Sequence, residues 1–245
     1  MVSFCLERRP SFNLPQLLNR RYALIKDWSP LALSLWIASL AGLIALILGV
    51  GLAWLLVIKN FRGKVFIEGL TLLSLVLPPT VLGYYLLLIL GQQGLGPFFE
   101  RFLGFRFVFA WPGAVVAASI TALPLVVQTA RISFSDISKE IEDAARVDGC
   151  TEWQLFWQIM VPIAWRGILA GGLLGFLRAL GEFGATLMVA GNIPGRTQTL
   201  AMAIYDAVQG NDMARANSLA FLLIGIAFAL LIMALWMNRR VLSES

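Results

Sequence analysis

Five stretches of the chain are apolar over the length of a membrane-spanning helix. The hydrocarbon core of a bilayer is about 30 Å thick, so a helix needs roughly 20 apolar residues to cross it. Four of the stretches carry no charged residue, and the remaining one carries a single arginine and a single glutamate. We therefore expect an all-α integral membrane protein, a bundle of about five transmembrane helices with spans at residues 31–58, 69–91, 111–130, 167–190 and 219–237.

Composition agrees with this fold class and excludes several chemistries. The chain is 59% hydrophobic and 13% charged, whereas soluble domains average about 45–50% apolar and about 25% charged residues. It contains no histidine, which removes the commonest general base and the commonest metal ligand. Its two cysteines, Cys5 and Cys150, are too far apart to suggest a metal site. The net charge of +5 comes without a long basic tract, so it indicates a membrane surface and not nucleic acid as partner.

The pattern divides the chain into one membrane domain and two tails. We assign residues 1–29 to a basic N-terminal tail, 30–240 to the membrane domain and 241–245 to a C-terminal tail. The segment 197–209 is short and mildly amphipathic, which favours an external helix or a partly inserted hairpin over a sixth span. Lysine and arginine number nine on each side of the predicted membrane, so the positive-inside rule leaves the orientation open.

Prolines interrupt two of the predicted spans. Pro78 and Pro79 lie in the second span and Pro124 lies in the third. A proline within a membrane helix frees backbone groups that neighbouring helices or water must satisfy. These residues therefore suggest kinked helices inside the bundle, and both a harmless kink and a functional hinge are compatible with the pattern.

The longest polar segment between spans, residues 131–166, has the pattern of two short helices. Gly149 stands where the first helix would end in a left-handed turn. Thr151 and Gln154 have the spacing of a capping box at the start of the second helix, which we expect Pro162 to end before the next span. Candidate N-caps for the first helix are Ser135, Asp136 and Ser138. A structured insert of this kind is typical of a docking element for a partner.

Small and apolar side chains mark the surface of this insert. Asp143, Ala144 and Ala145 would let another backbone approach closely, although the alanines also suit ordinary helix positions. The second helix carries an apolar stripe, which could belong to the docking surface but also suits packing against the protein's own bundle or at the membrane interface. This stripe consists of Trp153, Phe156, Trp157 and Met160.

The spacing of these residues is similar to that of the EAA loop of type I ABC importer permeases. The family pattern is Glu-Ala-Ala, three residues, Gly, nine residues, Ile, one residue and Leu-Pro; here Asp143 replaces the glutamate and Val161 the leucine. The resemblance extends over about residues 30–240. It implies that the insert is a cytoplasmic coupling helix in a groove of a separate ATPase, with the N-terminus external. The residues that it assigns to coupling are Glu142, Asp143, Ala144, Ala145, Gly149, Ile159 and Pro162.

A second motif resembles the molybdate permease subunits of that family. It reads Arg-Ala-Leu-Gly-Glu-Phe-Gly-Ala-Thr at residues 178–186, followed by Gly-Asn-Ile-Pro-Gly at 191–195. Sulfate and thiosulfate permeases are close relatives that more often carry tyrosine where Phe183 stands. The resemblance therefore favours molybdate or tungstate as substrate, with sulfate as the alternative.

Arg178 and Glu182 are the only charged residues within a predicted span. Their i, i+4 spacing would place both on one helix face, near the bilayer middle, where ionisable groups face the bundle interior. The pair either fixes helix packing or lines a translocation path or gate that presents positive charge to an oxyanion. Gly181 and Gly184 would allow close helix packing beside it.

The resemblance implies a permease subunit and not an enzyme. We expect a homodimer in the plasma (inner) membrane of a prokaryote, in contact with lipid, two cytoplasmic ABC ATPase subunits and an external molybdate-binding protein. The chain lacks the Gly-x-x-x-x-Gly-Lys-Ser/Thr phosphate loop, so we expect no cofactor in it and assign ATP-Mg to the ATPase. An intramembrane enzyme would need convergent titratable groups, for which only Arg178 and Glu182 qualify. A passive channel would need no docking insert.

Overall fold

The computed structural model describes residues 28–58 and 61–242. Most of the predicted N-terminal tail, including Cys5, lies outside the described residues, as do residues 243–245 of the predicted C-terminal tail. All regular elements of the described chain are helical. Their bounds are α2 Trp28–Ile58, α3 Lys64–Val76, α4 Pro79–Leu90, α5 Gly96–Leu103, α6 Trp111–Ser135, α7 Lys139–Val147, α8 Glu152–Gln154, the π-helical segment η1 Leu155–Met160, α9 Val161–Leu180, α10 Gly184–Ala190, α11 Leu200–Gln209 and α12 Met213–Leu242.

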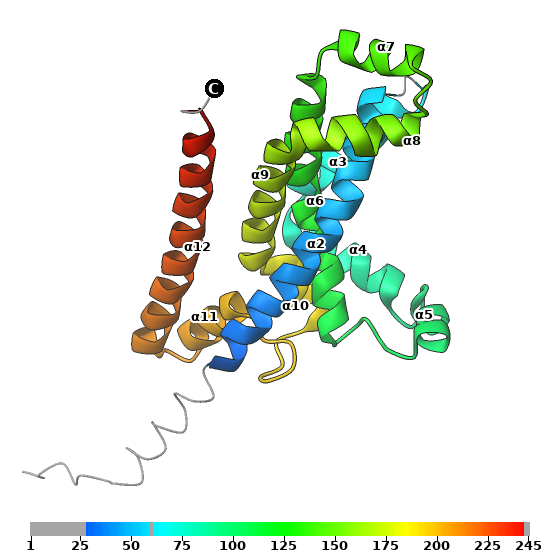
Figure 1. The fold of residues 1–245 in the computed structure, drawn as a ribbon. Coiled ribbons are helices and arrows are strands. Elements are labelled where there is room, and N and C mark those ends of the chain that lie inside the picture. Colours follow the sequence, from blue (N-terminus) through cyan, green and yellow to red (C-terminus); the bar gives the residue numbers. More distant parts are fainter. Residues whose placement is uncertain (1–27, 59–60, 243–245) are drawn as a thin grey trace, which may run out of the picture.

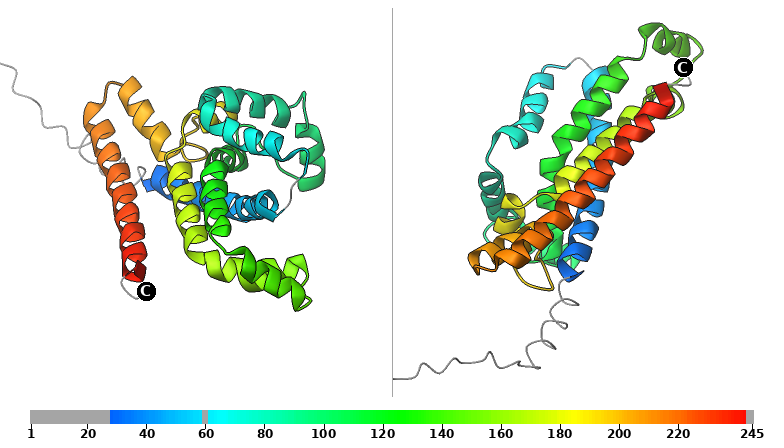
Figure 2. Two further views of the ribbon diagram at one scale, coloured as in Figure 1. Left: turned by 90° about the horizontal axis from the view of Figure 1, so that it is seen from above. Right: turned by 90° about the vertical axis from the view of Figure 1, so that its left-hand side faces the viewer.

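Three long helices, α2, α6 and α9, form the centre of the bundle and pack side by side (Figures 1 and 2). Their contact surfaces are built largely from small residues. Ala38 and Ala41 of α2 and Ala114 and Ala118 of α6 are fully buried in one cluster. Small side chains let membrane helices approach closely, and the resulting van der Waals contacts hold the helices together where lipid supplies no hydrophobic drive.

Glycines give α9 a smooth face against α6. Gly167, Gly171 and Gly175 repeat every four residues, so they lie along one side of the helix. A Cβ atom at Gly171 would collide with Thr129 of α6, and one at Gly175 would lie 2.8 Å from Cγ2 of Val126. The contact between α6 and α9 therefore depends on the absence of side chains along this face.

The contact between α4 and α10 is equally close and gives a testable prediction. A Cβ atom at Gly83 would lie 2.8 Å from the Cα of Ala185, a backbone atom that can move only if α10 shifts. We expect Gly83→Ala to destabilise the protein by about 1–3 kcal/mol, as overpacking usually does. The matched control is Gly225→Ala in α12, where an added Cβ meets no described atom within 4 Å. Thermal unfolding of the purified protein in detergent measures both, and equal melting temperatures would contradict the close contact.

The predicted second span, residues 69–91, is not one continuous helix. The chain forms α3 and α4, which are bent by 116° relative to each other. The break falls at Pro78 and Pro79, because Pro78 has an extended backbone and neither proline has the N–H that a continuous helix needs. Four described helices are long and apolar enough to cross a membrane, and a fifth crossing results if the bent pair counts as one. The prediction of an all-α bundle of about five spans is thus confirmed.

The predicted fourth span, residues 167–190, differs from the structure at both ends. α8, η1 and α9 form one run of 29 helical residues, Glu152–Leu180, so Pro162 does not end the second helix of the insert. The π-helical segment η1 ends at Met160, two residues before this proline, and its wider hydrogen-bond pattern accommodates a residue without an N–H. The helix ends at Gly181, and α10 is a separate short helix.

The boundaries of the other predicted segments differ less from those of the structure. α6 continues to Ser135, so the first residues of the predicted insert 131–166 belong to a long helix. α12 begins at Met213, ahead of the predicted span 219–237. α11 is a helix of ten residues within the segment 197–209, where we predicted an external helix or a partly inserted hairpin in preference to a sixth span.

The two ends of the bundle carry different elements. α7 and α8 lie at one end, whereas α5, α10 and α11 lie toward the other (Figure 1). α12 packs mainly against α11 and stands apart from the central helices. Large apolar side chains of α12 are exposed, as expected of a face that meets lipid or another subunit. They include Phe221, Ile224 and Phe228.

Candidate functional site

α7, which carries the alanines singled out in the sequence, lies at one end of the bundle (Figure 1). Glu140 and Glu142 in its first turn and Arg146 in its last turn complement the helix dipole. The chain turns at Gly149, whose φ of +86° is a left-handed conformation that favours glycine. The predicted end of the first helix is therefore confirmed.

The next helix begins with the predicted capping box. The N–H of Thr151 donates to Oε1 of Gln154 at 2.8 Å, and the N–H of Gln154 donates to Oγ1 of Thr151 at 3.3 Å. Two backbone donors that have no partner within the helix are satisfied in this way. Local sequence thus fixes where α8 starts.

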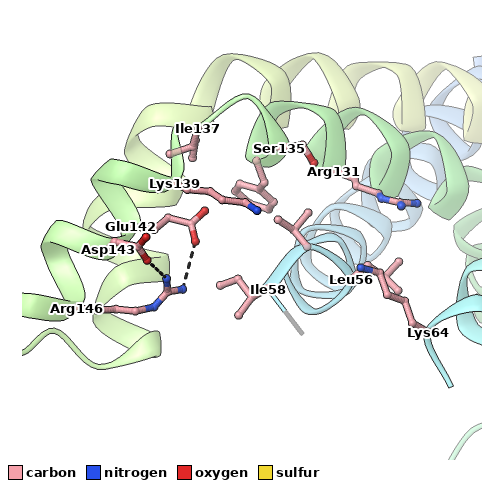
Figure 3. A pocket seen from close by; sticks show the side chains of 12 residues that line it. Leu56, Ile58, Lys64, Arg131, Ser135, Ile137, Lys139, Glu142, Asp143 and Arg146 are labelled. Carbon is pink, nitrogen blue, oxygen red and sulfur yellow. Dashed lines mark hydrogen bonds and ion pairs between the residues drawn. The ribbon is translucent and has the colours of Figure 1, made fainter. Parts of the chain in front are cut away.

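Arg146 holds the two helices of the insert together. Its guanidinium pairs with Glu142 at 3.2 Å, with Asp143 at 3.1 Å and with Glu152 of α8 at 3.0 Å (Figure 3 shows the first two). The hydrogen bond to Glu152, aided by those to the two α7 carboxylates, raises the pKa of Arg146 above its ordinary value. Arg146 is not among the residues predicted for coupling, although acids three and four positions before an arginine are typical of helix ion pairs.

The two neighbouring alanines of the motif differ in burial. Ala145 is only 7% exposed and packs in an apolar cluster with Leu155 and Phe156. Ala144 is exposed, and so is the side chain of Asp143. Ala145 therefore fixes α7 on the following helix, while Asp143 and Ala144 face outward.

Val147 adds an apolar side chain to the outward part of α7. It is 87% exposed, and Ile141 earlier in the same helix is exposed as well. Exposed apolar side chains thus share this short charged helix with the exposed Asp143 and Ala144. We refer to Ile141, Asp143, Ala144 and Val147 together as the α7 surface.

The other residues predicted for coupling lie on the following helix. Ile159 is half-buried and packs against the apolar cluster beneath α7, and Pro162 is exposed at the start of α9. The aromatic stripe of this helix is divided, because Phe156 is buried whereas Trp153 and Trp157 are exposed. Ile159 and Phe156 thus support the position of α7 and do not extend its outward surface.

Arg178 and Glu182 form an ion pair, but not on one helix as predicted. Arg178 lies in the last turn of α9 and Glu182 in the turn before α10, with Nη1 of the arginine 2.7 Å from Oε2 of the glutamate. The Glu182 side chain is 1% exposed, and its Oε1 accepts a hydrogen bond from the N–H of Ala185 at 2.9 Å. The Arg178 side chain is 29% exposed. A buried carboxylate therefore holds a partly accessible guanidinium at the break between α9 and α10.

The two glycines beside this pair have different surroundings. A Cβ atom at Gly184 would lie 3.1 Å from Cβ of Pro79, so the close packing predicted for Gly184 is found against the start of α4. Gly181 is exposed, and an added Cβ would meet only a carbonyl oxygen of its own helix at 3.7 Å. The prediction of close helix packing is therefore wrong for Gly181.

Other ion pairs lie outside the insert and the α9–α10 break. Glu68 of α3 pairs with Arg131 of α6. Glu100 of α5 accepts a hydrogen bond from Arg106 at 2.7 Å, and this bond lowers the pKa of Glu100. Within the described residues, no group of three or more His, Cys, Asp or Glu side chains is placed to hold a metal ion.

The arrangement of helices matches the membrane domains of solved ABC transporters. A bacterial ABC transporter that imports alginate superimposes with a TM-score of 0.72, over 96% of this chain and 86% of that chain, at 15% identity. The MetNI methionine ABC transporter gives a TM-score of 0.66, over 86% of this chain and 94% of that chain, at 16% identity. At these identities the likeness concerns the fold alone.

The sequence itself shows to which protein family the chain belongs. Residues 24–243 match the family described as binding-protein-dependent transport system inner membrane component. The chain therefore belongs to this family, and it is a membrane component of a transport system and not an enzyme.

Relatives within the family are similar over nearly the whole chain. The molybdenum transport system permease protein ModB of Haemophilus influenzae is 40% identical, over 86% of this chain and 93% of its own length. ModB of Escherichia coli K12 is 39% identical, over 87% of this chain and 94% of its own length. A probable sulfate transport system permease protein, cysT of Zygnema circumcarinatum, is 33% identical over 80% of this chain and 68% of its own length.

Proposed function

We propose that this chain is the permease subunit of an ATP-driven importer that translocates molybdate, with tungstate as a substrate of the same kind. The observation that carries the proposal is the identity of about 40% to molybdenum permease proteins over almost the full chain. The sulfate permease relatives are less similar and match less of the chain. Phe183 in the Gly-Glu-Phe-Gly motif supports the same choice.

The α7 surface is the docking site for a cytoplasmic ABC ATPase subunit, which binds ATP-Mg. Its exposed apolar and small side chains suit insertion into a groove of a partner protein. This assignment places the α7 end of the bundle in the cytoplasm. The end with α5, α10 and α11 then faces outward, where an external molybdate-binding protein delivers the substrate.

Two copies of the chain form the importer, with the path between them. Support comes from large apolar side chains that the described chain leaves uncovered on helices away from the central bundle. Those on α3 include Val65, Phe66 and Val76. Part of this apolar surface meets the second copy and the rest meets lipid.

The helix Glu152–Leu180 transmits movement from the ATPase to the path. Arg146 clamps α7 to the first residue of this helix, and Arg178 lies at its other end. When the ATPase subunits close on ATP, they carry α7 and this helix together, which opens the path outward. Hydrolysis then restores the inward-facing state.

Arg178 presents positive charge to the passing oxyanion. Because its guanidinium is already paired with Glu182, it attracts an anion only weakly. Weak attraction suits a conduit, since an anion must leave as readily as it enters.

The experiment that tests the proposal uses the permease and its ATPase reconstituted in liposomes with the binding protein. We expect molybdate and tungstate, but not sulfate, to stimulate ATP hydrolysis several-fold. Stimulation by sulfate alone would instead identify a sulfate permease and would contradict the homodimer, because sulfate systems of this family pair two different permeases. A lack of response to all three anions would overturn the substrate assignment.

A further inference from the structure

A cavity of about 460 Å³ opens beside α7, among the ends of α2, α3 and α6 (Figure 3). Basic side chains from three different elements line it. They are Lys64 at the start of α3, Arg131 of α6, and Lys139 and Arg146 of α7. In Figure 3, the charged end of Lys139 points into the space between α7 and the end of α2, and Arg131 and Lys64 lie across that space from α7. Cationic groups thus reach the cavity from both sides.

Acidic side chains of the cavity are drawn to one side of it. Glu142 and Asp143 also line the cavity, but both are paired with Arg146. Arg131 is paired with Glu68, whereas Lys139 forms no ion pair with a described residue. The two acidic side chains that line the cavity are therefore held at Arg146, which leaves the ammonium group of Lys139 available to an anion.

Apolar side chains complete the walls. Leu56 and Ile58 at the end of α2 and Phe134 of α6 line the cavity together with the basic residues. Next to Lys64, Val65 and Phe66 of α3 are exposed. The site therefore combines cationic groups with an adjoining apolar surface, which suits an amphiphile better than a fully hydrated ion.

We propose that this cavity binds the phosphate group of an anionic phospholipid, with the acyl chains along the exposed face of α3. Basic pockets between helices on the cytoplasmic side of a membrane are suited to such head groups. The assignment to the inner leaflet rests on the proposed function, which places α7 in the cytoplasm. A lipid held here touches α3, α6 and α7 at once, so it steadies the docking helix against the membrane-embedded helices.

Native mass spectrometry of the purified permease, extracted from bilayers of phosphatidylglycerol and phosphatidylcholine, tests the proposal. We expect the wild type to retain about one phosphatidylglycerol per chain and no phosphatidylcholine. The double variant Lys64→Gln/Lys139→Gln should retain about tenfold less phosphatidylglycerol, since each basic group near the membrane surface contributes appreciably to the binding of an anionic lipid. The control Arg62→Gln/Arg166→Gln removes two exposed cations that do not line the cavity, and it should behave as the wild type.

Equal retention by both double variants would overturn the site, and so would retention of phosphatidylcholine to the same extent. An excess of inorganic phosphate distinguishes the two sources of a phosphate group. If it displaced the lipid completely, the cavity would be a site for soluble oxyanions and the lipid assignment would be wrong. Because this measurement needs neither ATPase nor molybdate, its failure is separate from a failure of the proposed function.

Discussion

Val147→Asp should lower substrate-stimulated ATP hydrolysis by about tenfold or more, the effect of losing a central contact of an interface. Val147 is the most exposed large apolar side chain of α7, and its own chain does not cover it. A carboxylate at this position would have to be buried against the ATPase without a partner, which is costly. The fold should not change, because the side chain makes no buried contact within the subunit.

The control for this prediction is Val147→Ala, which keeps the position apolar and should retain most of the coupling. Gel filtration and thermal unfolding in detergent check that both variants stay folded, and co-purification measures ATPase binding. Ala145→Asp is a contrasting variant, because Ala145 lies on the buried side of α7, and it should destabilise the permease itself. Full stimulation of the Val147→Asp variant would contradict docking at the α7 surface.

Local signals made the helix boundaries within the insert predictable from the sequence. Gly149 ends a helix because few other residues adopt its positive φ, and Thr151 with Gln154 forms a capping box through contacts three residues apart. Such features depend on the immediate neighbours of a residue, so spacing alone predicts them. The apolar spans were predictable for the same reason, since hydropathy is a property of each segment.

Features that depend on the path of the whole chain were not predictable in this way. Residues 161–166 looked like the end of an insert, but the π-helical turn ahead of Pro162 lets the helix continue to Leu180. The pair between Glu68 and Arg131 joins positions 63 residues apart, and only the packing of α3 on α6 brings them together. The different burial of Ala144 and Ala145 likewise follows from how α7 rests on η1, which no local pattern specifies.

Substitutions in the ion pair of Arg178 and Glu182 should have the second large effect, first on the stability of the permease and then on transport. Arg178→Gln should destabilise the permease by roughly 3–5 kcal/mol, because it leaves the buried carboxylate of Glu182 without a counter-charge. Glu182→Gln should cost less, since the amide oxygen can still accept the hydrogen bond from Ala185 and the arginine is partly exposed. Thermal unfolding in detergent measures both losses.

The double variant Arg178→Gln/Glu182→Gln distinguishes a role of the pair in helix packing from a role in transport. Two neutral amides can hydrogen-bond to each other, so we expect the melting temperature to return close to that of the wild type. Molybdate uptake into proteoliposomes should nevertheless stay about tenfold below the wild type, which corresponds to a loss of roughly 1.4 kcal/mol in the attraction of the anion. The stability of the double variant serves as the control, because it shows that the helices still pack. If uptake recovered together with stability, the pair would serve only to join α9 to α10, and the positive charge of Arg178 would have no part in conducting the oxyanion.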